Sequence, residues 1–94
     1  MDIPYHPPVK RSLAIHGHRT SISLEPIFWD LLKRAASEEG IALAALVARI
    51  DAERIQAETP PGLAGALRVW LAVRIVAGSS QGANSDGSIG EIER

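Results

Sequence analysis

The sequence predicts a small, mainly helical domain with one β-strand per chain, expected to pair with a second copy of itself. Three observations point to this fold class: an alternating segment at residues 19–25, a helix that starts at Pro26 and ends at Gly40, and the absence of cysteine. A chain of 94 residues has an apolar core of marginal size unless disulfides, a metal or a partner add to it. Disulfides are excluded, so a second subunit is the expected supplement.

The alternating segment is interpreted as a strand with two unlike faces. Side chains of a strand point alternately to its two sides. The inward, core face would consist of Thr20, Ile22 and Leu24, and the outward face of Arg19, Ser21 and Ser23. No other segment offers this strand an obvious partner, so we expect it to pair antiparallel with its own copy about Ile22.

Three regions are expected along the chain. Residues 1–15 are predicted to form a flexible basic arm, because Pro4, Pro7 and Pro8 favour irregular backbone. Residues 16–77 would form the domain. Residues 78–94 are rich in Gly, Ser, Asn and Asp and are expected to be a disordered tail.

Helix signals follow the strand. Pro26 suits a first helical position and Gly40 a left-handed C-cap. A second helix is expected over residues 42–57, with a weak start because Ala42 has no side-chain oxygen for capping. After a break at residues 59–62, a third helix is expected over residues 63–77.

The third helix is apolar around most of its circumference, but it is too short and too charged for a membrane span. Its Leu63, Leu67, Trp70 and Leu71 would be core. The opposite stripe would stay exposed and could mediate assembly beyond a dimer; it consists of Ala66, Val69, Val73 and Val76. An ion pair of Asp51 with Arg54 or Arg68 would fix how this helix docks.

The order of strand, helix, glycine turn and helix over residues 19–57 resembles the ribbon-helix-helix family of bacterial DNA-binding proteins, which includes the Met and Arc repressors. The segments that carry the resemblance are residues 16–26, 28–30, 43–47 and 50–51, and a helical segment like residues 63–75 is found in a less characterised branch. The resemblance implies an intertwined homodimer whose paired strands form a two-stranded antiparallel ribbon in the major groove of double-stranded DNA.

Carried over to this sequence, the base-reading residues would be Arg19, Ser21 and Ser23, the same three that alternation places outward. An arginine can make a bidentate hydrogen bond to guanine, whereas serine can donate or accept at several bases. Arg19 is therefore expected to dominate specificity.

Phosphate contacts are expected from two places. Lys10 and Arg11 would bind phosphates without reading sequence. The family also clamps phosphate with the amino end of the second helix, where the backbone amides of Ala42 and Leu43 would act here. Ala42 stands where the family often has a hydroxyl, which weakens this contact.

Other interpretations of the same residues stay open. A polar strand face can be merely solvated, and pairing about Ile22 would place Arg19 opposite Glu25, which would neutralise it. His16 and His18 could bind zinc, nickel or copper. The two histidine pairs of a dimer would lie about 25 Å apart, so they could not share one ion, and no metal is assigned.

Composition restricts the function further. Without cysteine there is no thiolate catalysis, and no set of nucleophile, base and oxyanion donor suggests an enzyme or a cofactor. The N-terminus lacks a signal pattern, so a cytoplasmic protein is expected. The net charge is −1, but residues 1–24 have a local basic excess, with Lys10, Arg11 and Arg19 against Asp2 alone.

The predicted function is a homodimeric DNA-binding transcriptional regulator. One alternative is a non-DNA oligomeric assembly or metal-binding module on the same fold. The other is an antitoxin-like regulator whose segment from Leu63 onward captures another protein.

Overall fold

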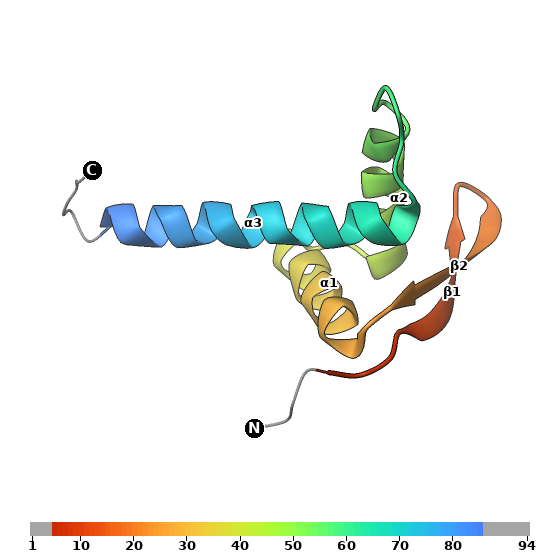
Figure 1. Cartoon of the computed structure of the whole chain (residues 1–94), viewed down its shortest axis with the longest axis horizontal. Coiled ribbons are helices and arrows are strands. Elements are labelled where there is room, and N and C mark those ends of the chain that lie inside the picture. The colour runs from red at the N-terminus through yellow and green to blue at the C-terminus, as the bar shows by residue number, and fades with distance from the viewer. Residues whose placement is uncertain (1–4, 86–94) are drawn as a thin grey trace.

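The computed structural model describes residues 5–85, and their side chains up to residue 78. Two strands precede three helices. The bounds are β1 Val9–Ile15, β2 His18–Leu24, α1 Pro26–Glu39, α2 Leu43–Arg54 and α3 Leu63–Ser85. In Figure 1 the strands lie at one end, α1 and α2 extend to opposite sides of α3, and α3 runs past them and projects beyond the body.

The two strands form an antiparallel hairpin within one chain, with Val9 opposite Leu24 and Ile15 opposite His18. His16 and Gly17 make the two-residue turn. Both have positive φ, 53° and 79°, which is the condition for a type I′ hairpin turn. Glycine adopts this conformation readily, whereas for His16 it is an unusual one.

The hairpin corrects the expectation of one strand per chain. The partner of β2 is β1, from the part of residues 1–15 that was predicted to be a flexible arm. Its inward side chains include Arg11, which is an unusual residue for a core-facing position. This charged residue interrupts the alternation of apolar and polar residues that would otherwise indicate a strand. The guanidinium of Arg11 lies 5.5 Å from the ring centroid of Trp29, and the indole N–H of Trp29 donates to the carbonyl oxygen of Val9 at 2.9 Å. These contacts fix β1 on α1.

The first two helices agree with their terminal signals. Pro26 is the first residue of α1, and Gly40, with φ of 70°, is its left-handed C-cap, as predicted. The N–H of Ile41 donates to the carbonyl of Ala36, which closes the helix end. The second helix begins after Ala42, which makes no side-chain cap, and ends at Arg54, earlier than the predicted residue 57.

The core closes within one chain. Apolar side chains from β1, β2 and all three helices form one buried cluster, and none of them is more than 4% exposed. Its members are Ile15, Ile22, Leu24, Trp29, Leu32, Ala35, Ala36, Leu46, Val47, Ile50, Leu67 and Leu71. Among the described residues, β1 and α3 therefore provide cover that a minimal strand-helix-helix unit would lack.

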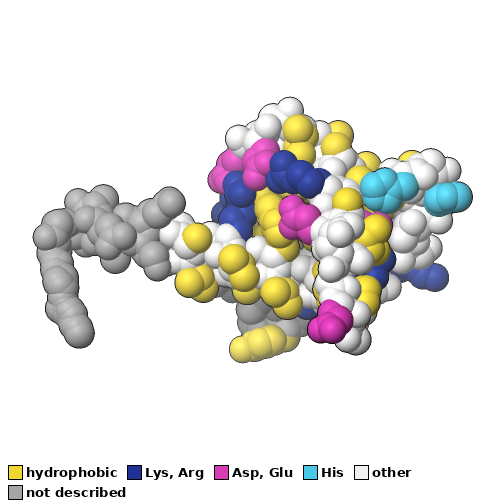
Figure 2. All heavy atoms as spheres, turned by 90° about the horizontal axis from the view of Figure 1, so that it is seen from above, with side chains coloured by type: hydrophobic (Ala, Val, Ile, Leu, Met, Phe, Trp, Pro, Cys, Tyr) yellow, Lys and Arg dark blue, Asp and Glu magenta, His cyan; other side chains and the backbone are white. Residues whose placement is uncertain are grey.

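The third helix is longer than predicted. It continues through Ser85, beyond the expected end at Ala77, and the rest of the predicted tail, residues 86–94, lies outside the described residues. The predicted exposed stripe is confirmed for Val69, Val73 and Val76, which are 62–64% exposed, whereas its fourth member, Ala66, is half-buried. Figure 2 shows hydrophobic side chains along the part of α3 that leaves the body. Within the described part of the chain, the helices lack the length and hydropathy needed to cross a membrane.

Candidate nucleic-acid interface

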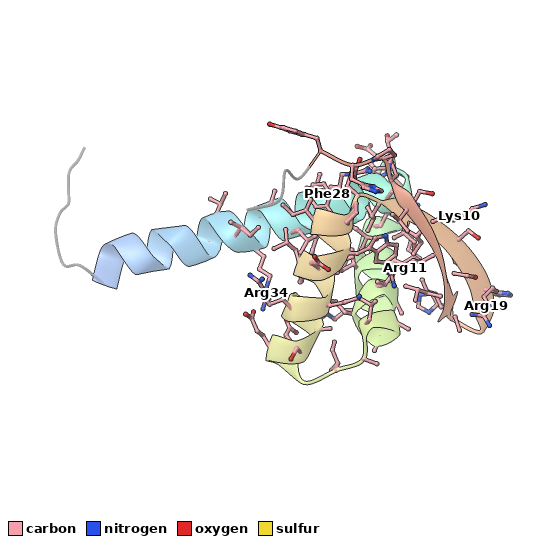
Figure 3. The ribbon with its side chains drawn as sticks, turned by 90° about the horizontal axis from the view of Figure 1, so that it is seen from below. Lys10, Arg11, Arg19, Phe28 and Arg34 are labelled. Atoms are coloured by element: carbon pink, nitrogen blue, oxygen red, sulfur yellow. The ribbon has the colours of Figure 1, made fainter. Side chains whose placement is uncertain are left out.

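The hairpin presents a polar surface on the side away from the helices, which we call the outer face. It combines alternate residues of both strands: Lys10, Ser12, Ala14, Arg19, Ser21 and Ser23. All six are exposed. The register places Lys10 opposite Ser23 and Ser12 opposite Ser21, so the polar side chains form adjacent rows. In Figure 3 Lys10 and Arg19 point away from the helices.

The outer face is positively charged. It carries Lys10 and Arg19, and it has no carboxylate, since all six of its residues are described. Neither cation forms an ion pair with the side chains described, those of residues 5–78, whereas Arg49, Arg54 and Arg68 are each paired. These two charges are therefore available to a ligand.

Glu25 is engaged elsewhere. Its carboxylate accepts hydrogen bonds from the Nε and Nη2 of Arg68, at 3.2 and 2.8 Å. The hydrogen bond from Arg68 holds the pKa of Glu25 below its ordinary value. Arg19 lies opposite Ala14 in the hairpin. Within the chain, the neutralising pair of Arg19 and Glu25 is not formed.

Lys10 and Arg11, which the sequence grouped together, lie on opposite faces of β1. Lys10 belongs to the outer face. Arg11 is inward, with its guanidinium over Trp29, although the residue remains exposed at the edge of the hairpin. Figure 3 shows Arg11 between the hairpin and the helices. A ligand on the outer face would therefore meet Lys10 directly, whereas Arg11 lies on the other side of the strand.

The amino end of α2 is free of side-chain caps. Ala42 is the N-cap, with φ of −68° and ψ of 152°, and the first turn contains no acidic residue. Ala42 is exposed and Leu43 is half-buried. The backbone amides of a first helical turn have no intrahelical acceptor, so those of this turn remain suited to an anion.

The two histidines of the predicted metal pair have separate surroundings. His16 is in the turn, and its Nε2 lies 3.6 Å from the Oδ2 of Asp51. Asp51 also binds Arg54 at 2.7 Å, so of its two expected partners the structure selects Arg54. His18 begins β2, opposite Ile15. Residues 5–85 contain no cluster of three or more groups suited to a metal ion.

Ser12 and Trp29 were missed by the sequence interpretation of this surface. Ser12 adds a hydroxyl beside Ser21, and Trp29 anchors the strand that carries it. A signal for Ser12 was present, because Gly17 lies in a two-residue gap between two segments of strand character.

Comparisons with known proteins agree with this architecture. The chain matches the family model described as "Ribbon-helix-helix domain" over residues 8–75, a range that includes β1 and most of α3. No curated protein matches it. The solved structure of an uncharacterized protein from Bordetella pertussis Tohama I is 29% identical with a TM-score of 0.67. The match covers 79% of this chain, which spans 60% of the length of that structure. The chain belongs to the ribbon-helix-helix domain family.

Proposed function

We propose that this protein is a DNA-binding transcriptional regulator that contacts the major groove with the outer face of its hairpin. The observation that carries the proposal is that face itself: two unpaired cations and three serines, without a carboxylate. Ribbon-helix-helix proteins generally read DNA in this way, with strand side chains against base edges.

Base reading is assigned to Arg19, Ser21 and Ser23. The guanidinium of Arg19 can donate two hydrogen bonds to O6 and N7 of guanine, the commonest specific contact in the major groove. Serine hydroxyls can donate to or accept from several bases, so Ser21 and Ser23 would tune the preference rather than dominate it.

Phosphate binding is assigned to residues around this face. Lys10 lies opposite Ser23 at the border of the base-reading row. Arg11 extends from the other side of the same strand, and the amides of Ala42 and Leu43 offer an uncapped helix end. Such contacts hold the protein on the duplex and make its affinity depend on salt.

The regulator is proposed to act as a homodimer, which would bind two related half-sites. The exposed valines of α3 favour a further contact between dimers. Two of them, Val69 and Val73, line a largely apolar groove of about 340 Å³ between α2 and α3, together with Ile50 and Trp70. Burying such a surface against another copy would remove apolar area from water.

The test is selection of bound sequences from a random duplex library, followed by affinity measurements on selected and random duplexes. Arg19→Ala should reduce the preference for the selected sequence by about 5- to 150-fold, which corresponds to about 1–3 kcal/mol for one bidentate contact. Lys33→Ala, which removes an equal charge from an exposed site on α1, is the matched control and should keep the preference.

Two outcomes would contradict the proposal at different levels. Unchanged selectivity in Arg19→Ala would show that another side chain reads the sequence. Absence of enrichment, together with no binding to any duplex at low salt, would overturn DNA binding itself.

A further inference from the structure

Both strands of the hairpin contribute to its outer face. Each residue of β2 that is assigned to base reading has an outward neighbour on β1. The three cross-strand pairs are Ala14 with Arg19, Ser12 with Ser21, and Lys10 with Ser23. All of these side chains are exposed. A ligand that covers the outward residues of β2 therefore also meets β1.

The turn brings the paired side chains close together. In an antiparallel pair, hydrogen-bonded and non-hydrogen-bonded positions alternate. A two-residue turn makes its flanking residues, Ile15 and His18, a hydrogen-bonded pair. All three outward pairs then fall at non-hydrogen-bonded positions, where the two Cα atoms are about 4.5 Å apart. Ser12 and Ser21 are thus separated by little more than one base-pair step, which is about 3.4 Å.

The hairpin has the width that a DNA groove accepts. Its two strands have axes about 4.8 Å apart. A major groove is about 12 Å wide and admits a two-stranded β-ribbon. Both strands of one chain therefore fit between the phosphate backbones, and the outer face of β1 meets base edges as that of β2 does.

The first strand is fixed at both of its ends. At the start, Trp29 donates a hydrogen bond to the carbonyl oxygen of Val9 at 2.9 Å. At the turn, Ile15 is buried in the core. Ser12 is midway between these anchors, and its neighbour Arg11 stacks on the same tryptophan. The Ser12 hydroxyl is therefore presented at a defined position beside Ser21.

We propose that β1 is a second base-reading strand, in which Ser12 and Ala14 contact base edges beside Ser21 and Arg19. A serine hydroxyl can donate to or accept from a base, and an alanine methyl can contact the 5-methyl group of thymine. The inference rests on the proposed function and enlarges its set of specificity residues. Lys10 keeps its phosphate contact, since it lies at the open end of the hairpin in Figure 3.

The register predicts how the contacts are spaced along the DNA. Successive outward residues of a strand are about 6.8 Å apart, which corresponds to about two base-pair steps. Ser12 and Ser21 should act on the same or on adjacent base pairs. Arg19 should act about two base pairs away. The thymine contacted by Ala14 should lie within about one base pair of the guanine bound by Arg19.

The main test is selection from a random duplex library with Ser12→Asn in the full chain. Asparagine can form a bidentate contact with adenine, so this variant should select adenine at one base pair and leave the others as in the wild type. Ser37→Asn is the matched control, because it makes the same change at an exposed serine of α1. It should select the wild-type sequence.

Removal of the hydroxyl tests the position of the contact. Ser12→Ala should reduce the preference at one base pair by about 2- to 12-fold, as expected for one neutral hydrogen bond. That base pair should be the same as, or adjacent to, the one affected by Ser21→Ala. A preference lost instead beside the base pair that Arg19→Ala affects would contradict the register.

The contribution of Ala14 is tested with a change in the DNA. Replacing the selected thymine with deoxyuridine removes only its 5-methyl group. Wild-type affinity should fall by about fourfold, the value for one buried methyl-sized group. Ala14→Gly should bind the two duplexes equally. Equal binding by the wild type would remove Ala14 from the reading residues.

The outcomes separate the inference from the proposed function. If the wild type enriches a sequence and Ser12→Asn enriches the same one, β1 does not read bases and the proposed function stands. Equal weakening of selected and random duplexes in Ser12→Ala would place Ser12 at the phosphates and overturn the inference alone. If Ser12→Asn fails to fold by circular dichroism, the result with Ser12→Ala decides. A wild type that binds no duplex at low salt overturns both.

Discussion

The two faces of the β1–β2 hairpin differ in burial and in contacts, although their residues alternate along the same strands. On the inner face Ile15, Ile22 and Leu24 are at most 4% exposed, and even the charged Arg11 stacks on Trp29. On the outer face no polar side chain has an ion-pair partner within the described residues, and none is buried. The side chains that make no contact with the core are therefore the ones available to bind a ligand.

The largest expected effect compares adjacent residues of β2. Leu24→Ala leaves a cavity in the core and should lower the free energy of unfolding by about 2–5 kcal/mol. Ser23→Ala, one position earlier and exposed, should change it by less than about 0.5 kcal/mol. Urea unfolding followed by circular dichroism measures both. Similar losses in the two variants would mean that the faces are not separated as described.

A smaller effect distinguishes Lys10 from Arg11. Arg11→Ala should cost about 0.5–1 kcal/mol of folding stability, because it removes a cation–π contact at a partly exposed site. Lys10→Ala should leave stability unchanged. It should instead reduce the dependence of log affinity for DNA on log salt by about 1 for each phosphate that Lys10 binds. A normal salt dependence in Lys10→Ala would remove this side chain from the interface.

The smallest expected effect concerns acid sensitivity. Arg68 lowers the pKa of Glu25 in the folded state, so the unfolded chain binds more protons as the pH falls below the ordinary glutamate value of 4.5. The contribution of the Glu25–Arg68 pair to the free energy of unfolding is present at neutral pH. It is lost as the pH falls through the folded-state pKa of Glu25. In acid titrations of the urea midpoint, Glu25→Gln should show a shallower decline than the wild type. An identical decline would assign acid sensitivity to other groups.

Local signals in the sequence predicted much of the fold. Pro26 and Gly40 set the ends of α1 because their backbone preferences act within a few residues. The alternation of residues 19–24 separated the two faces of β2 correctly. The same alternation selected Arg19, Ser21 and Ser23 as outward side chains, although their contact with DNA stays a prediction.

What the sequence did not predict depends on distant contacts. The partner of β2 was assigned to another copy, because inward Arg11 disguised β1 and only its stacking on Trp29 makes that position favourable. The turn places His16 in a conformation that few non-glycine residues adopt. Glu25 is bound by Arg68, which lies 43 residues away in sequence. No local pattern specifies such a pair.

The two-residue turn at His16 and Gly17 also has a kinetic consequence. A ribbon made of one strand from each of two chains can form only when the chains meet, so its folding slows on dilution. Here the strands are joined directly, and contacts between neighbours in sequence form early and by a unimolecular step. The surface that carries Lys10 and Arg19 is therefore assembled within a single chain, at any protein concentration.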